Sequence, residues 1–213
     1  MKRSLLLALG LLAAPSMVSA QLFGIPNYAS PSAFGTPATF LAATYGRGLN
    51  DASGKLDAYA AAIGRSGLGN RFTVVGGVGM IDAAESEWTF GGSLSADLLQ
   101  AASATQVSVQ GGVGYLGVDV LGETLTTLNF PIGVALKYNI PGPTATVTPW
   151  VMPRANIMRA SLGGVSSTET DFGASAGFGV TLPNGFGAHS AIDLLAADEN
   201  LWTVGVGIHY VMP

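Results

Sequence analysis

Large apolar residues alternate with small or polar residues in ten successive stretches of the chain. In the last stretch the apolar positions are Trp202, Val204, Val206, Ile208 and Tyr210, and every residue between them is small or polar. A period of two residues is typical of a β-strand that has one apolar and one polar face. The pattern therefore predicts an all-β fold.

The ten stretches are separated by short connections that contain turn-forming residues. The alternating stretches lie at 41–45, 59–63, 72–80, 88–98, 107–115, 128–138, 146–158, 172–182, 186–194 and 202–210. Connections such as "GVDVLGET" (117–124), "LGGVSSTET" (162–170) and "PNG" (183–185) are predicted as turns. Ten strands joined in this way predict an antiparallel meander. The count becomes eight or twelve if 149–153 or 21–36 is assigned differently.

The alternation by itself fits two kinds of β-protein. In a soluble sandwich or barrel the apolar face forms the core, whereas in an outer-membrane barrel it contacts lipid and the other face lines the lumen. The aromatic residues separate the two, because they sort by height when the N-terminus starts on the periplasmic side. The periplasmic group is Phe72, Tyr138, Phe186 and Tyr210, and the external group is Tyr45, Tyr59, Trp88, Tyr115, Phe172 and Trp202. Two such girdles around an aliphatic band favour a closed antiparallel up-and-down transmembrane β-barrel.

The C-terminal stretch carries a resemblance to a known family. Residues 37–213 resemble the small bacterial outer-membrane β-barrels of the OmpA/OmpX-like kind, and residues 202–210 are the most specific part. In that family the last strand ends on an aromatic residue and is thought to be read by the barrel-assembly machinery. The resemblance implies the same partner here, although "VMP" follows the last aromatic in this chain.

Composition supports the membrane alternative. Only 10% of the residues are charged and 48% are hydrophobic, whereas a soluble domain normally has about 25% charged residues. No stretch after residue 20 is long and apolar enough for a membrane helix, and 30 glycines disfavour helices. The net charge of −4 argues against a nucleic-acid partner, and the absence of cysteine excludes disulfides.

The first twenty residues have the layout of a secretory signal peptide. Lys2 and Arg3 precede an apolar run at 5–14, and small residues follow before Gln21. Cleavage after Ala20 would leave 193 of the 213 residues and, through loss of the two basic residues, change the net charge from −4 to −6. The predicted organisation is a signal peptide at 1–20, an irregular lead at 21–36 and a β-barrel domain at 37–213.

Four charged residues are predicted to point into the lumen. These residues are Asp97, Lys137, Arg154 and Asp193. A ten-stranded barrel is narrow, and unpaired buried charges are unfavourable, so the four are expected to pair across the lumen. They would form either an internal ionic plug or a charged constriction for small ions.

The two histidines are predicted to be inward-facing diagonal neighbours on the last two strands. Two nearby imidazoles suggest a metal site, but no third ligand for His189 and His209 is evident, so a hydrogen-bonded pair is expected and no metal or cofactor is predicted. Ser190 follows His189, yet its parity directs it to the lipid face. A catalytic triad is therefore excluded, and no enzyme activity is predicted.

The sequence thus predicts a non-enzymatic protein of a Gram-negative-type outer membrane with a structural, surface-interaction or minor channel role. Two alternatives stay open: a passive porin-like channel for small solutes or ions, and a soluble exported β-protein that binds lipid or carbohydrate. The expected partners are outer-membrane lipid, lipopolysaccharide bridged by cations to acidic external loops, and the assembly machinery. The oligomeric state is left open.

Overall fold

The computed structural model describes residues 38–50, 57–82, 86–99, 104–120, 122–196 and 200–212. The predicted signal peptide and N-terminal lead lie outside these residues. Within the described ranges, no helix is long and apolar enough to cross a membrane.

The strands fall into two groups by length. Six strands of 11 or 12 residues are β1 (Ala38–Gly48), β2 (Asp57–Leu68), β3 (Phe72–Asp82), β4 (Ser86–Asp97), β10 (Phe186–Ala196) and β11 (Leu201–Met212). Four strands of 16 or 17 residues are β5 (Thr105–Val120), β6 (Glu123–Tyr138), β8 (Thr146–Leu162) and β9 (Val165–Thr181). The two-residue β7 (Ile140–Pro141) pairs with the start of β8.

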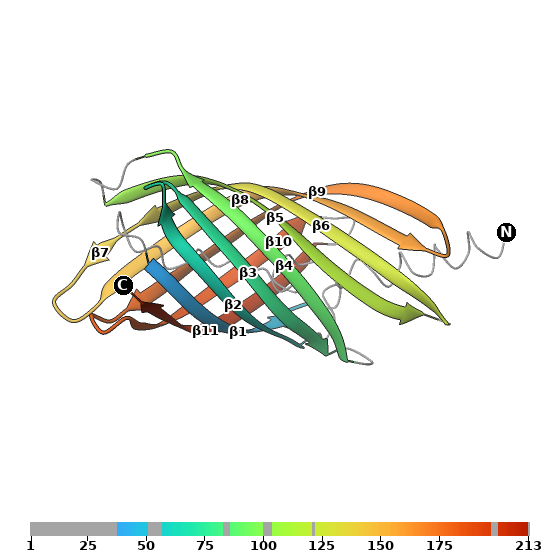
Figure 1. The fold of residues 1–213 in the computed structure, drawn as a ribbon, viewed down its shortest axis with the longest axis horizontal. Coiled ribbons are helices and arrows are strands. Elements are labelled where there is room, and N and C mark those ends of the chain that lie inside the picture. Colours follow the sequence, from blue (N-terminus) through green and yellow to red (C-terminus); the bar gives the residue numbers. More distant parts are fainter. Residues whose placement is uncertain are drawn as a thin grey trace.

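Ten strands, all except the two-residue β7, form one closed antiparallel barrel (Figure 1). Each strand pairs with its neighbours in sequence, β1 pairs with β11, and β6 pairs with β8 across β7. The predicted all-β, ten-stranded up-and-down architecture is therefore confirmed. A closed wall leaves no edge strand where every strand has two neighbours, which matters for a chain with so much β-surface.

The two ends of the barrel are named from the course of the chain. At the terminal end β1 begins and β11 ends, and Thr39 lies opposite Met212. At the far end β8 and β9 are joined by Gly163 and Gly164, which have φ angles of 58° and 80°. Two successive positive φ angles produce a two-residue turn whose twist matches the flanking strands, and glycine adopts them without strain.

The apolar face of the wall points outward, as the aromatic positions predicted. On β11, Ile208 is 67% exposed and Val206 is 50% exposed, whereas Gly205 and the neighbouring inward residues Thr203 and His209 are buried. Some inward positions also carry large apolar side chains, such as the buried Phe40 and Trp150, so small and polar residues are not the whole inner lining.

Two predicted turns are wrong in extent. Residues 117–120 and 123–124 of the first belong to β5 and β6, so only residues 121 and 122 separate the two strands. Residues 165–170 of the second belong to β9, which starts seven residues before the alternation does at Phe172. In β9 the alternation starts late because both faces of residues 166–170 carry polar side chains, whereas in β5 Val118 has the same parity as the buried Leu116.

The long strands carry the wall beyond the rest of the far-end rim. Phe172 lies opposite Ala196, the last residue of β10, and β9 continues beyond this point with β8 as its paired neighbour. We call the far-end parts of the long strands the protruding sheet, which comprises residues 117–120, 123–126, 156–162 and 165–171.

Candidate functional site

The interior of the barrel is the candidate site, and its side chains form layers between the two ends. Along β10 the inward residues from the far end to the terminal end are Leu195, Asp193, Ala191 and His189, and all four are buried. Each of these four residues belongs to a different layer of the interior, so the layers are described below in the order of their β10 residues.

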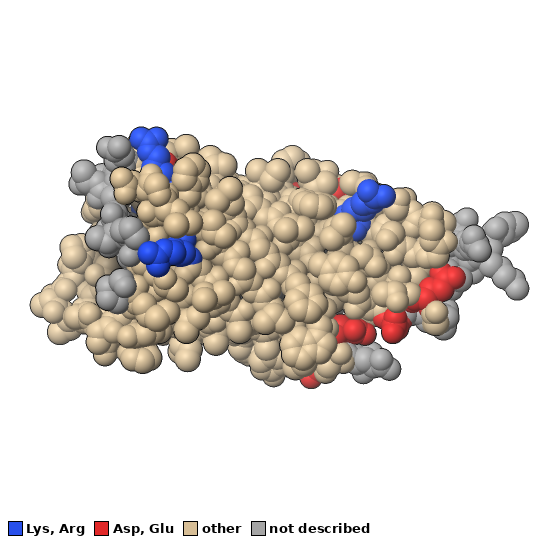
Figure 2. All heavy atoms as spheres, viewed as in Figure 1, with Lys and Arg blue, Asp and Glu red and all other residues tan. Residues whose placement is uncertain are grey.

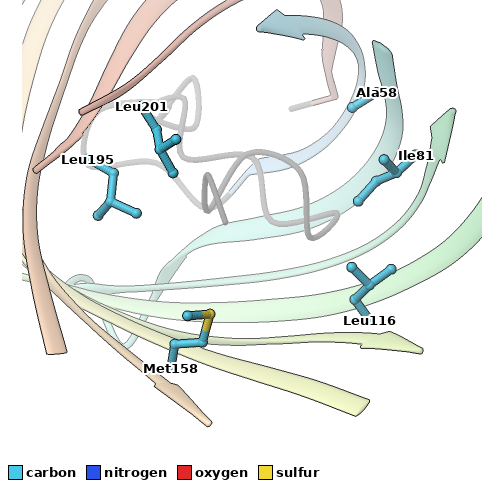
Figure 3. Packing of buried hydrophobic residues seen from close by; sticks show 6 residues of the cluster. All are labelled: Ala58, Ile81, Leu116, Met158, Leu195 and Leu201. Carbon is cyan, nitrogen blue, oxygen red and sulfur yellow. The ribbon is translucent and has the colours of Figure 1, made fainter. Parts of the chain in front are cut away.

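The layer nearest the far end is apolar. Six buried side chains from six strands point toward a shared interior space (Figure 3). We call this layer the far-end collar: Ala58, Ile81, Leu116, Met158, Leu195 and Leu201. Small and polar residues were predicted at the inward positions, so this apolar layer was not predicted from the sequence. The parity of Leu195 and Leu201, which they share with Asp193 and Thr203, was the available signal.

Directly below the collar, a buried ion pair links β8 to β10. The guanidinium of Arg154 donates from Nη1 and Nη2 to the two carboxylate oxygens of Asp193 at 2.6 and 2.8 Å. Ser175 on β9 donates to the same carboxylate and accepts from Arg154 at 2.6 Å, and Arg154 Nε donates to Asn156 Oδ1 at 3.2 Å. Such bidentate, additionally hydrogen-bonded pairs are the strong ones, and here the pair holds three strands in register.

The other two predicted lumen charges lie in a different layer. Lys137 is buried on the inward face of β6 opposite Trp150, which is two inward positions nearer the terminal end than Arg154. Asp97, at the terminal end of β4, is half-buried and interacts electrostatically with Lys137. The four predicted charges are therefore split into two sets, and only Arg154 and Asp193 share the central layer.

Two further apolar clusters fill the half of the barrel toward the terminal end. One comprises Ala135, Trp150, Met152 and Ala191, and the other comprises Phe40, Ala62 and Val75. The ring of Phe40 occupies the space that a Cβ at Gly64 would need. Large inward side chains next to glycines therefore fill the lumen.

Two buried asparagines border the central layer. Asn129 lies opposite Met158 of the collar, and its Nδ2 and Oδ1, together with Nδ2 of Asn156, have no hydrogen-bond partner among the described residues. Both side chains are 0% exposed. Ordered water is the usual partner of such buried polar atoms.

The histidines form the centre of a hydrogen-bonded chain near the terminal end. His189 Nε2 lies 3.0 Å from Thr44 Oγ1, and His209 Nε2 lies 2.9 Å from Thr181 Oγ1. The two Nδ1 atoms face each other at 3.3 Å. Four strands, β1, β11, β10 and β9, are linked in this way across the inner wall.

The room for the two rings comes from a reciprocal arrangement of glycines. The sequences Gly187-Ala188-His189 and Gly207-Ile208-His209 run antiparallel, so each histidine lies opposite the glycine of the other strand. A Cβ at Gly207 would overlap the His189 ring, and a Cβ at Gly187 would overlap the His209 ring. The predicted neighbourhood of the histidines is present, with glycine as the residue that permits it.

The surroundings of the histidines contain neither a positioned nucleophile nor a set of three metal ligands among the described residues. Ser190 lies on the outward face and donates to the carbonyl of Gly205 at 3.1 Å, so it does not approach His189 as a nucleophile would. No group of three or more potential metal-ligating side chains occurs in the described part of the chain.

The outer surface carries aromatic residues near both ends and charges beyond them. The ring centroids of Tyr45 and Tyr59 lie 5.4 Å apart near the far end, and those of Phe186 and Tyr210 lie 4.5 Å apart near the terminal end. The remaining aromatics assigned to the two girdles are exposed at the expected heights: Phe72 and Tyr138 toward the terminal end, and Trp88, Tyr115, Phe172 and Trp202 toward the far end.

Charged side chains avoid the middle of the barrel on the face shown in Figure 2, where an uncharged band separates the two ends. Apart from the interior Asp193 and the half-buried Asp97, the described acidic residues lie at the far end: Asp57, Asp82, Glu87, Asp119, Glu123, Glu169 and Asp171. Arg65 and Arg71 are exposed at the terminal end. The predicted Asp51, Glu85, Asp198 and Glu199 lie outside the described residues.

No protein-family model matches the chain, and no curated protein sequence matches it. Solved structures with a similar course of strands include the β-domain of the Bordetella autotransporter BrkA (12% identity, 82% of this chain and 98% of that one, TM-score 0.49). The translocator domain of the autotransporter NalP from Neisseria meningitidis has 13% sequence identity and a TM-score of 0.43, and the match covers 98% of this chain and 97% of that one. The N-terminal barrel of Pseudomonas aeruginosa OprF has 13% identity and a TM-score of 0.36, and the match covers 82% of this chain and 97% of that one. At this similarity no function is transferred, and the barrel assignment depends on the strand pairing described above.

Proposed function

We propose that this chain is an integral outer-membrane β-barrel without a catalytic role, and that its far end is a surface-interaction platform. The observation that carries the proposal is the outward face of the closed wall. Exposed side chains such as Val206 and Ile208 lie between two groups of aromatics. On the face shown in Figure 2, a band without charges separates the two ends. Such a surface is unfavourable in water and favourable in a bilayer, where a closed barrel also satisfies the backbone.

The platform is the protruding sheet. Ser166, Thr168 and Thr170 are exposed on its β9 strand, whereas Met158, Ala160 and Leu162 are buried on its β8 strand. On the side of β9 away from β8, residues 165–170 have no strand partner among the described residues. A strand edge of this kind accepts an additional strand from a partner protein, which supports a role in surface interactions.

The interior supports a structural or interaction role over an open channel. The Arg154–Asp193 pair, Trp150 and Phe40 lie in successive parts of the lumen, and all four side chains are buried. The acidic far end supports lipopolysaccharide as a further partner through bridging divalent cations, and the apolar last strand supports recognition by the assembly machinery.

The membrane setting is tested by fractionation of cells that express the full chain. The protein should remain in the membrane fraction after urea extraction, require detergent for solubilisation, and migrate differently on an SDS gel with and without boiling. Release into the soluble fraction without detergent would overturn the proposal in favour of a soluble exported β-protein.

The orientation is tested with single cysteines, because the chain has none of its own. Thr168→Cys at the far end should react with a membrane-impermeant maleimide on intact cells. Asn184→Cys, exposed in the turn at the terminal end, should react only after the outer membrane is permeabilised. The opposite labelling pattern would place the protruding sheet in the periplasm.

The channel alternative is tested by reconstitution into planar bilayers. We expect no conductance steps above the detergent background, because side chains fill the lumen. Reproducible single-channel steps would replace the interaction role with a channel role.

A further inference from the structure

We propose that His189 and His209 form a two-coordinate binding site for a monovalent d10 cation of the copper(I) and silver(I) class, held in line between the two Nδ1 atoms. The site goes beyond the proposed function and depends only on the interior of the barrel. It is built by the reciprocal Gly-x-His segments of β10 and β11.

The geometry of the two rings selects this coordination. Their planes are inclined by only 18° and their centroids lie 5.6 Å apart, while the two Nδ1 atoms are 3.3 Å apart. A centroid separation this much longer than the nitrogen separation means that the rings lie side by side, edge to edge. The Nδ1 lone pair of an imidazole lies in the ring plane, so both lone pairs are directed at the same point between the rings.

The threonines complete the ligand environment. A histidine that binds a metal through one nitrogen usually donates the other N–H to a fixed acceptor, which sets the tautomer and the ring orientation. Here each Nε2 lies within hydrogen-bond distance of a threonine hydroxyl, Thr44 for His189 and Thr181 for His209. When both hydroxyls accept from Nε2–H, two acceptor nitrogens face each other, and a cation between them removes their repulsion.

The number of protein ligands disfavours zinc. Zinc sites in proteins use three or four protein ligands, and the described residues contain no group of three histidine, cysteine or carboxylate side chains that could hold a metal. Copper and silver in the monovalent d10 state accept two ligands in line. With metal–nitrogen bonds of about 2 Å, the nitrogens must be about 4 Å apart, so the rings must separate by somewhat less than 1 Å from 3.3 Å.

The pair lies near the terminal end of the barrel. On β11, His209 is three residues from Met212, the last residue of the strand, and its β1 neighbour is Ala42. Because Gly187 and Gly207 lie opposite the rings, no neighbouring Cβ blocks a small outward movement along the wall.

The test measures binding of silver(I), a redox-inert probe, to the full-length folded barrel in detergent and chloride-free buffer. The chain has no cysteine to compete for silver. We expect one silver ion per chain to remain bound after gel filtration. Binding should weaken at least about 100-fold in His189→Gln and in His209→Gln, and about tenfold in Thr44→Val and Thr181→Val.

The matched control is Thr127→Val, which removes an inward hydroxyl on β6 by the same substitution and should leave silver affinity unchanged. Each variant must also show heat-dependent SDS gel migration, which verifies folding independently of silver. For copper(I), X-ray absorption should show two nitrogen ligands.

Three outcomes would overturn the proposal. They are no retained silver in the wild-type barrel, silver affinity unchanged in both histidine variants, and zinc(II) bound by the pair as tightly as silver. None of these outcomes bears on the membrane setting, which fractionation tests separately.

Discussion

The two parts of β9 have the same backbone conformation and the same neighbour, β8, yet their side chains differ completely. In residues 172–181 the outward positions include Phe172, Phe178 and Val180, and glycine or serine occupies most inward positions. In residues 165–171, serine, threonine and acidic residues occupy both faces after Val165. The difference shows that alternation along this chain marks contact with two different media and does not mark the strand itself.

The buried ion pair that Ser175 contacts from the inward face of residues 172–181 should show the largest effect. Arg154→Leu leaves Asp193 buried without its partner and should lower the free energy of unfolding by about 3–5 kcal/mol. Urea titration in phospholipid vesicles, followed by tryptophan fluorescence, measures this loss. Arg65→Leu, at an exposed position, should change it by less than about 0.5 kcal/mol.

The double variant Arg154→Leu/Asp193→Leu sharpens this prediction. Because it removes both charges, it should recover most of the stability lost in the single variant. A double variant no more stable than the single one would mean that the pair is not desolvated as the structure indicates.

A substitution on the outward face of residues 172–181 should have the next largest effect on stability. Phe178 is 50% exposed on the outward face of β9, six residues nearer the terminal end than Phe172. Phe178→Arg should lower the free energy of unfolding in vesicles by about 2–4 kcal/mol, the effect of a cation at the bilayer midplane. Phe178→Leu is the control, and an arginine tolerated without loss would argue against lipid at this height.

The boundary between the two parts should show an intermediate effect. Phe172 is 69% exposed where β10 ends, which is the height expected for the membrane interface. Phe172→Ala should lower the free energy of unfolding in vesicles by about 1 kcal/mol through lost apolar contact. No measurable loss would argue against an apolar medium around this side chain.

A substitution in residues 165–171 of β9 should have the smallest effect on stability. Thr168→Arg places a cation at an exposed position of the protruding sheet and should change the unfolding free energy by less than about 0.5 kcal/mol. If Thr168→Arg were as unfavourable as Phe178→Arg, lipid would have to cover the hairpin, and the platform would not exist.

The same contrast explains what the sequence alone could predict. Wherever one face meets an apolar medium, as at Trp202 to Tyr210, parity predicts both the strand and its orientation. Parity also predicts the inward position of His189, His209, Arg154 and Asp193.

The features that the sequence did not predict depend on three-dimensional neighbours. The start of β9 has no alternation because both faces are polar. The far-end collar combines single inward residues from six strands, so no one strand displays it. The unsatisfied amide of Asn129 depends on which side chains lie across the lumen, which strand register decides.

The pairing of β1 with β11 has a consequence for how the molecule is made. The first and last described strands form one seam of ten residue pairs, from Thr39–Met212 to Gly48–Thr203. Until the final strand is delivered, β1 and β10 both present bare hydrogen-bonding edges, and contacts this distant in sequence form slowly. Removing a few C-terminal residues should therefore open the seam between β1 and β11 rather than only shorten the barrel.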